Sequence, residues 1–187
     1  MSKEVIIVAG GNGVGKTTFA REFLLENPDY EFLNADEIAK ELSPDNPQSS
    51  KISAGKLFFK NLDKYVRDGK SFLIESTLSG RYLIKFIEDL QRQHYRITIM
   101  FLFVDSPKIL IERVRNRVSK SGHFIPDEDV KRRFKRGKHN FWNIYKASVE
   151  SWNLFYNASD GFRKIAASDE TGTAVIEEDL FNVFLSI

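Results

Sequence analysis

The sequence predicts an α/β fold in which a mostly parallel, five-stranded sheet lies between two layers of helices. Short runs of β-branched and aromatic residues alternate with segments in which apolar residues recur every three or four positions. Strands that alternate with helices in this way form parallel sheets covered on both faces. With 187 residues, 42% of them hydrophobic and 29% charged, we expect residues 1–187 to form a single globular domain.

The expected strands are apolar runs that end at glycine or at polar residues. EVIIVAG, the first run, is rich in β-branched residues and stops at glycines, and YRITIMFLFV is the strongest of the set. The five strands are expected over residues 4–10, 31–36, 71–76, 95–104 and 161–168. Ligands of parallel sheets bind beyond the carboxyl ends of the strands. The residues expected at those ends are Gly10, Asp36, Glu75 and Asp105.

The expected helices fill the segments between the strands. Asn27-Pro28 ends the first helix, and Ser106-Pro107 supplies the N-cap and first residue of a later one. A long aromatic-rich stretch places its rings at helical spacing, which is typical of core packing. The helices are expected over residues 17–25, 36–42, 53–67, 81–93, 107–120, from about 127, 139–157 and 174–186.

The composition excludes several classes of protein. There is no cysteine, so disulfides and thiolate metal sites are excluded, and a cytoplasmic location is expected. The longest largely apolar run, residues 97–104, is far too short to span a membrane. The N-terminus also lacks the apolar region and cleavage site of a signal peptide.

Residues 10–17, GGNGVGKT, match the phosphate-binding P-loop pattern G-x-x-x-x-G-K-[ST]. The motif follows an expected strand and opens an expected helix, which is the context that the pattern requires. Backbone N–H groups of such a loop surround a phosphate, and the lysine reaches the β- and γ-phosphates of a nucleotide. We therefore expect ATP and Mg²⁺ as cofactors, with Thr17 as the metal ligand. The expected nucleotide-binding residues are Gly10, Gly11, Asn12, Gly13, Val14, Gly15, Lys16, Thr17, Thr18 and Arg113.

Three acidic residues stand at expected strand ends, and for Asp36 and Asp105 a purely structural interpretation is also open. Glu75 or Asp105 could take the place next to Mg²⁺ that P-loop proteins give to an acid. Asp105, beside Ser106-Pro107, could instead only help to start a helix. Asp36 could likewise be a helix N-cap, whose side chain accepts hydrogen bonds from free backbone N–H groups.

A locally basic segment suggests a helix–loop–helix lid over about residues 112–138. Arg113 and Arg117 are four residues apart, so they share one helix face. Arg132, Arg133 and Arg136 follow after a break at SGHFIP. Arginine donors stabilise the charge that develops on a phosphoryl group during transfer. The alternatives are a solvated basic surface and a site for nucleic-acid phosphates.

Several motifs together resemble the zeta-toxin-like family of P-loop kinases, in the expected order over about residues 4–140. The segments that carry this resemblance are AGGNGVGKTT, FLNADEI, FLIESTLSG, FLFVDSPKILIERVRNRV and GHFIPDEDVKRRF. The resemblance implies a P-loop kinase-like three-layer fold and transfer of the γ-phosphate of ATP to a hydroxyl. The acceptor in the best-known members is UDP-N-acetylglucosamine, and the chain is closer to chromosomal relatives of those toxins.

The resemblance also implies roles for individual residues. Asp36 matches the general base, and Glu75 and Thr77 match substrate-binding positions. The residues expected to act in catalysis are Lys16, Asp36, Arg117 and Arg133, with Arg132 as the alternative to Arg133. An inhibitory antitoxin protein is a further expected partner.

Two other functions remain open from the sequence. A nucleoside or polynucleotide kinase would use the basic segment to bind its acceptor, although Asp127, Glu128 and Asp129 within that segment argue against nucleic acid. A nucleotide-dependent interaction protein would bind ATP with little turnover.

Overall fold

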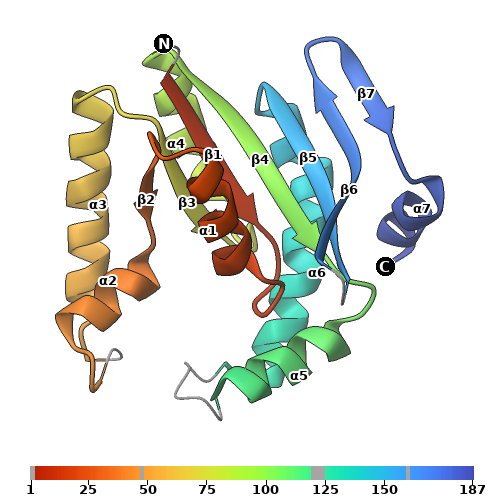
Figure 1. The fold of residues 1–187 in the computed structure, drawn as a ribbon, viewed down its shortest axis with the longest axis horizontal. Helices are drawn as coiled ribbons and strands as arrows, with labels where there is room; N and C mark the ends of the chain where they lie inside the picture. The colour runs from red at the N-terminus through yellow and green to blue at the C-terminus, as the bar shows by residue number, and fades with distance from the viewer. Residues whose placement is uncertain (1–2, 47–48, 119–124, 159–160) are drawn as a thin grey trace.

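A computed structural model describes residues 3–46, 49–118, 125–158 and 161–187 of the protein. Within these ranges the chain forms seven strands and seven α-helices (Figure 1). The strands are β1 (Lys3–Ala9), β2 (Glu31–Leu33), β3 (Phe72–Ser76), β4 (Tyr95–Phe103), β5 (Ser151–Ala158), β6 (Gly161–Asp169) and β7 (Gly172–Val175). The helices are α1 (Lys16–Glu26), α2 (Ala35–Leu42), α3 (Lys51–Arg67), α4 (Leu83–Arg92), α5 (Pro107–Val118), α6 (Asp127–Asn143) and α7 (Glu178–Ser186).

All seven strands belong to one sheet, in the order β2-β3-β1-β4-β5-β6-β7. The first five strands run parallel to one another, whereas β6 and β7 are antiparallel to their neighbours. The predicted α/β class and the mostly parallel sheet are therefore confirmed. The predicted number of five strands is wrong, because β5 and β7 were not expected.

Strand β5 lies in the stretch 139–157 that the sequence analysis interpreted as a helix. Helix α6 instead ends at Asn143, and a short 3₁₀ turn leads into β5. Trp152 and Leu154 of β5 pack in the core on one face of the sheet, while Phe155 packs on the other. A strand that is covered on both faces shows no simple polar–apolar alternation, so its pattern cannot be distinguished from that of a buried helix.

The C-terminal segment also differs from the expected helix over 174–186. Residues 172–175 form β7, which pairs with β6, and helix α7 begins only at Glu178. Gly172 has a φ of 130°, a conformation that favours glycine and that permits the tight β6–β7 turn.

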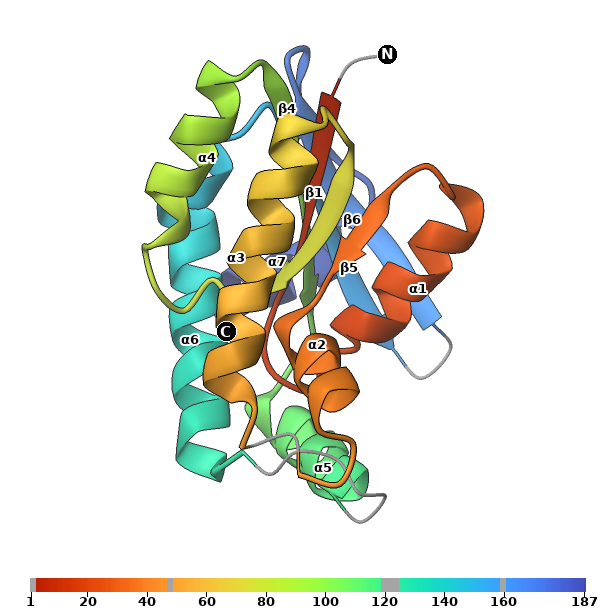
Figure 2. The same cartoon turned by 90° about the vertical axis from the view of Figure 1, so that its left-hand side faces the viewer.

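The sheet separates two apolar cores. Alternate residues of β1 point to opposite faces: Val5 and Ile7 belong to one core, and Ile6 and Val8 to the other. Helices α3, α4, α6 and α7 pack on the first face, whereas α1 and α5 pack on the second, together with the N-terminal half of α6. Figure 2 shows α3, α4 and α6 on the side of the sheet opposite α1.

The carboxyl ends of the parallel strands point toward α2 and α5 (Figure 1). Helices α5 and α6 occupy most of the expected lid. The movement of this pair as a lid stays a prediction. The organisation of residues 1–187 as a single domain also stays a prediction. Residues 119–124 of the expected lid, which include His123, lie outside the described residues. None of the helices in the described ranges is long and apolar enough to cross a membrane.

Candidate functional site

The loop between β1 and α1 has the backbone shape of a phosphate-binding loop. Gly10, Gly13 and Gly15 have φ angles of 137°, 83° and 94°, in the region that favours glycine. A Cβ atom on Gly15 would lie only 2.6 Å from Nδ2 of Asn157. The same Nδ2 donates a hydrogen bond to the carbonyl of Val14 at 2.7 Å. Strand β5, which the sequence analysis missed, therefore holds the loop in place.

Lys16 folds back over this loop. Its Nζ donates hydrogen bonds to the carbonyls of Gly10 at 3.0 Å and Gly11 at 3.1 Å. Burial of the ammonium group is the main cause that lowers the pKa of Lys16 to about 8, opposed first by the charge of Glu75. The nearby positive charge of Arg117 lowers this pKa further. The positive charges of Lys16 and Arg117 therefore lie close together, and a bound phosphate would stabilise both.

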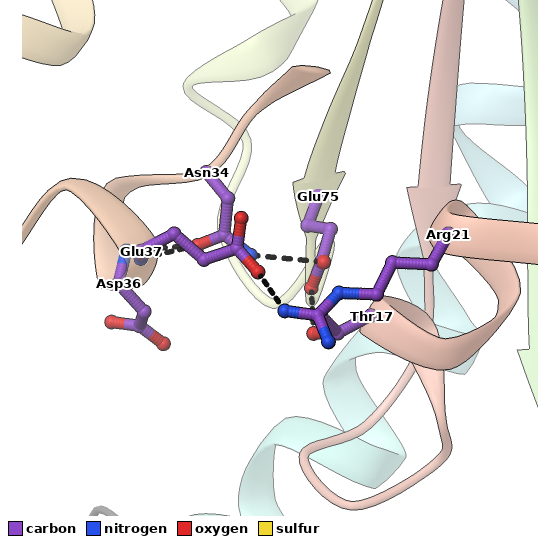
Figure 3. Close-up of polar contacts among 6 residues, drawn as sticks. All are labelled: Thr17, Arg21, Asn34, Asp36, Glu37 and Glu75. Carbon is purple, nitrogen blue, oxygen red and sulfur yellow. Dashed lines mark hydrogen bonds and ion pairs between the residues drawn. The ribbon is translucent and has the colours of Figure 1, made fainter. Parts of the chain in front are cut away.

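Glu75, at the end of β3, is linked to both α1 and α2. Its Oε2 accepts a hydrogen bond from Oγ1 of Thr17 at 3.2 Å, and its Oε1 accepts one from Nδ2 of Asn34 at 2.9 Å (Figure 3). Burial raises the pKa of the Glu75 carboxyl, while the Lys16 charge and the two hydrogen bonds oppose this shift. The three side chains form a polar link across the ends of β2 and β3.

Asn34, and not Asp36, is the N-cap of α2. The Oδ1 atom of Asn34 accepts hydrogen bonds from the backbone N–H groups of Asp36 at 2.8 Å and Glu37 at 3.3 Å. The capping interpretation of Asp36 is therefore wrong. The Asp36 residue lines a cleft beside the phosphate loop, and its carboxylate points away from Asn34 (Figure 3). No hydrogen bond or ion pair joins this carboxylate to another residue of the described part of the chain.

The basic segment divides into arginines that face the cleft and arginines that do not. Arg113, Arg117 and Arg133 line the cleft. Arg133 donates a hydrogen bond to Oδ1 of Asn12 at 3.1 Å, which places it against the phosphate loop. Arg132 instead forms an ion pair of 2.8 Å with Asp129, one turn earlier in α6.

Two further candidates lie outside the cleft. Asp105 is exposed at the end of β4 and accepts a hydrogen bond from the Tyr156 hydroxyl at 2.8 Å. It is not among the described residues that line the cleft, and neither is Arg136. Of the two acids considered for the place beside Thr17, Glu75 is therefore the one that the structure brings there.

The cleft has a volume of about 920 Å³ and two chemically different halves. One half contains the phosphate loop, Lys16 and the three arginines. Glu75, bonded to Thr17, lies beside the phosphate loop. The other half contains Asp36 and Thr77, together with apolar side chains from β3, α3 and α4. The apolar and aromatic residues of this second half are Phe58, Phe59, Leu62, Ile74, Tyr82, Leu83 and Phe86.

The loop that carries Thr77 is held by α6. Gly137 lies so close that a Cβ atom on it would be 2.3 Å from the carbonyl oxygen of Thr77. Three residues further along the helix, Nδ2 of Asn140 donates a hydrogen bond to the carbonyl of Leu78 at 2.7 Å. The Thr77 hydroxyl shares a hydrogen bond of 2.8 Å with that of Ser79. Helix α6 therefore positions Thr77 and Arg133 together.

Asn34 and the aromatic residues that line the cleft were not among the residues predicted from the sequence. Asn34 carries a sequence signal, because asparagine directly before Ala-Asp-Glu is typical of a helix N-cap with acidic residues in the first turn. Phe58 and Phe59 carry a second sequence signal. Because they are adjacent on one helix, their two rings cannot both face the core. Phe59 is in fact 62% exposed.

The residues present fit a magnesium ion that is bound together with a nucleotide. The Thr17 hydroxyl and the Glu75 carboxylate are hard oxygen donors within 3.2 Å of each other beside the phosphate loop. Among the described residues there is no group of three or more acidic, histidine or cysteine side chains that could hold a metal alone. Such a sparse set suits Mg²⁺, which takes its remaining ligands from phosphates and water.

The fold and the cleft together define a P-loop nucleotide-binding protein with a kinase-like arrangement of strands. A family model described as an AAA domain matches residues 5–139, so the chain belongs to this AAA-domain family. An uncharacterized protein from Haemophilus influenzae is 28% identical over 134 residues, which cover 72% of this chain and 94% of that protein.

Solved structures share the fold at low sequence identity. One comes from the PezAT chromosomal toxin–antitoxin system of Streptococcus pneumoniae, with a TM-score of 0.71 and 20% identity over 100% of this chain and 80% of the other. Another is the AvrRxo1-ORF1:-ORF2 complex with ATP, with a TM-score of 0.74 and 16% identity over 99% of this chain. The chain spans 64% of the length of that protein.

A putative kinase from Chloroflexus aurantiacus is similar over 73% of this chain and 80% of its own, with a TM-score of 0.56 and 19% identity. The predicted resemblance is confirmed in two respects: the chain belongs to a P-loop family, and it shares its fold with the structure from the PezAT system.

Proposed function

We propose that the protein is a kinase that transfers the γ-phosphate of ATP to a hydroxyl group of a small molecule. The observation that carries this proposal is the division of one cleft into a cationic phosphate-loop half and an acidic, aromatic half. A protein that only bound or hydrolysed a nucleotide would have no need for the second half. A kinase needs it to hold the acceptor next to the γ-phosphate.

The donor half suits a nucleoside triphosphate. Backbone N–H groups of the loop over 10–17 and the N-terminus of α1 favour the β-phosphate, and Lys16 would exchange its two carbonyl partners for phosphate oxygens. Arg117 and Arg133 line the same half and would offset the charge of the γ-phosphate. When bound, Mg²⁺ neutralises phosphate charge, and Thr17 and Glu75 would hold it.

Asp36 is the proposed general base. In the transfer, the acceptor oxygen forms a bond to the γ-phosphorus, and the bond from that phosphorus to the β–γ bridging oxygen breaks. ADP leaves with the bonding electron pair, and the proton of the acceptor hydroxyl passes to a carboxylate oxygen of Asp36. This role is supported because the Asp36 carboxylate faces the cleft and the α2 cap is made by Asn34 instead.

The basic segment gives less support to a polynucleotide acceptor. Three of its cations are paired with acids of the same segment: Arg115 with Asp127, Lys131 with Glu128, and Arg132 with Asp129. Such pairing reduces the positive charge that would attract a nucleic-acid backbone. A small-molecule acceptor is therefore the better proposal.

A protein partner and a cytoplasmic location are further proposals. The similarity to a protein of the PezAT toxin–antitoxin system supports a search for an antitoxin that binds this chain. The alternative to a kinase is an interaction protein that turns over little ATP. Such a protein would bind its partner in a nucleotide-dependent way and would form no phosphorylated product.

The test is turnover of Mg-ATP with a panel of hydroxyl acceptors, identified by the mass of the products. The panel includes UDP-N-acetylglucosamine, which the resemblance implies, and a set of uncharged alcohols and nucleosides. Asp36→Asn should retain ATP binding and lose at least 100-fold of the acceptor-dependent turnover. Glu41→Gln, an exposed carboxylate change on the same helix, is the matched control and should keep full activity. Equal turnover of Asp36→Asn and wild type would overturn the proposed base.

A further inference from the structure

The loop after β3 contains a residue in a backbone conformation that leucine rarely adopts. Leu78 has a φ of 51°, in the left-handed region that disfavours bulky side chains. Among the described residues, only Leu78 and His94 combine a positive φ with a side chain other than glycine. His94 follows the C-terminus of α4, where such a conformation is common. Leu78 ends no helix, so its conformation needs another cause.

Side chains from two elements hold Leu78 in this conformation. Its backbone N–H donates a hydrogen bond to the hydroxyl of Ser76 at 3.1 Å, and its carbonyl accepts one from Nδ2 of Asn140 at 2.7 Å. The Leu78 side chain is itself buried in the core. Strained backbone persists where surrounding groups fix it from several sides, and it is common at ligand sites. The residues on either side of Leu78 are therefore candidates for ligand contact.

The end of the same loop is fixed by Tyr145. Its hydroxyl donates a hydrogen bond to the carbonyl of Gly80 at 2.7 Å, and Nδ2 of Asn140 lies 3.5 Å from the same oxygen. Burial raises the pKa of the Tyr145 hydroxyl to about 12, so this donor stays protonated at physiological pH. Asn140 and Tyr145 are both buried, and a carbonyl left without a partner beside them would be costly.

Two hydroxyl side chains meet on either side of Leu78. Thr77 and Ser79 share a hydrogen bond of 2.8 Å, and Thr77 lines the cleft. The half of the cleft that contains Thr77 and Asp36 is called the acceptor half, because the proposed function places the acceptor there. A hydroxyl has one proton to donate, so a fixed partner limits the directions in which it can bind a ligand. The Ser79 hydroxyl therefore restricts the orientation of the Thr77 hydroxyl.

The loop is also attached to the phosphate loop. The carbonyl of Ser76 accepts a hydrogen bond from the backbone N–H of Gly10 at 3.2 Å. Thr77 directly follows Ser76, so its backbone is tied to the donor half. Small displacements between two reactants strongly lower the rate of their reaction. An accurate position of Thr77 relative to the phosphate loop would therefore favour transfer.

We propose that Asn140 and Tyr145 are positioning residues for the acceptor. They hold Leu78 in its left-handed conformation, and this conformation keeps the paired hydroxyls of Thr77 and Ser79 at the acceptor half. The inference rests on the proposed kinase function and adds to it two residues that touch neither ATP nor the acceptor. A purely structural role would make Asn140 and Tyr145 important for stability alone.

The experiment compares Tyr145→Phe with a matched control. Steady-state kinetics are measured with Mg-ATP and a compound of the acceptor panel that wild type phosphorylates. Tyr145→Phe should raise the acceptor KM about tenfold and keep the ATP KM within about twofold of wild type. Tyr95 is another buried tyrosine whose hydroxyl bonds to backbone carbonyls, but it lies at the start of β4, at the opposite end of the sheet. Tyr95→Phe should lower stability and leave both KM values unchanged.

Ser79→Ala tests the hydroxyl pair in the same way. It should raise the acceptor KM severalfold, because the Thr77 hydroxyl loses its partner. The matched control is Ser151→Ala, which removes the partner of the Thr98 hydroxyl in a pair of 2.7 Å that does not line the cleft. This control should keep the acceptor KM of wild type.

The conformation of Leu78 is measured separately by NMR. The backbone chemical shifts of Leu78 should be those of a left-handed residue in wild type. In Asn140→Ala they should move away from left-handed values, and the acceptor KM should rise at least as much as in Tyr145→Phe. Left-handed shifts together with an unchanged acceptor KM in Asn140→Ala would overturn the inference.

The kinetic results separate this inference from the kinase proposal. Equal acceptor KM values in Tyr145→Phe and Tyr95→Phe would overturn the positioning role and leave the kinase standing. A parallel rise of the ATP KM and the acceptor KM in Tyr145→Phe would also overturn it, because the effect would not be specific to the acceptor. If wild type phosphorylates no compound of the panel, the kinase proposal fails, and this inference fails with it.

Discussion

At the scale of single residues, Asn34 connects the two carboxylates of the proposed site. Its amide oxygen fixes the first turn of α2, on which Asp36 stands, and its amide nitrogen holds Glu75 beside Thr17. One side chain therefore sets the distance between the proposed base and the proposed magnesium site. A residue in this role positions the catalytic groups without touching the reacting atoms.

The two hydrogen-bonding functions of Asn34 can be separated by substitution. Asn34→Ala should lose about 1–2 kcal/mol of unfolding free energy because α2 loses its cap. Asn34→Ser can still cap the helix, so it should stay within about 0.5 kcal/mol of wild type, but it is too short to reach Glu75. Chemical denaturation measures the stabilities, and turnover should fall in both variants. Full activity of Asn34→Ser would contradict the positioning role.

Lys16 makes ATP binding sensitive to alkaline pH. Its pKa of about 8 in the free protein should rise beside bound phosphates, so ATP binding takes up a proton above pH 8. The dissociation constant should therefore increase by up to about tenfold per pH unit above pH 8. Calorimetry in two buffers with different ionisation enthalpies measures this uptake directly.

Unfolding would not explain such a loss of affinity. Because the pKa of Lys16 is lower than its ordinary value of 10.5, the unfolded chain binds more protons than the folded one between about pH 8 and 10.5. The contribution of Lys16 to the stability of the free protein thus rises with pH across this window. Lys16→Met should bind ATP weakly and without the pH dependence. An affinity of wild type that stays constant up to pH 9.5 would contradict the assignment.

At the scale of elements, α6 connects the proposed lid with the acceptor half. Its half-buried Arg133 reaches the phosphate loop, and one turn later Gly137 packs against the backbone at Thr77. Asn140 then holds the carbonyl of Leu78. A displacement of α6 would therefore disturb the arginine of the donor half and the threonine of the acceptor half together.

Two glycine-to-alanine changes in helices should have opposite effects. In Gly137→Ala the new methyl group would lie 2.3 Å from the Thr77 carbonyl oxygen, so the helix must shift, at a cost of about 1–3 kcal/mol. In Gly55→Ala the methyl group meets nothing within 4 Å, and α3 should gain up to about 1 kcal/mol. Thermal denaturation measures both. Equal stability of the two variants would contradict the close approach of α6 to Thr77.

At the scale of the whole molecule, local patterns predicted the part of the fold that surrounds the phosphate loop. The β-branched run before GGNGVGKT and the Ser106-Pro107 start of α5 are signals within a few residues of the chain. Strand β5 has no such signal, because its pairing with β4 and β6 decides its conformation and both of its faces are buried. Asp36 and Glu75 were predicted from strand ends, whereas the presence of Phe59 and Tyr82 in the same cleft depends on where α3 and α4 lie in the fold.

The most direct test of the central claim, phosphate transfer from ATP to a small-molecule hydroxyl, uses an unbiased mixture of acceptors. A small-molecule extract is incubated with Mg-ATP and either wild type or Asp36→Asn, and the products are compared by mass spectrometry. We expect a compound that gains one phosphoryl group with wild type and not with Asp36→Asn, although both proteins bind ATP. If ATP binds and no compound gains a phosphoryl group, or if Asp36→Asn forms the same product at the same rate, the claim of an Asp36-dependent kinase is contradicted.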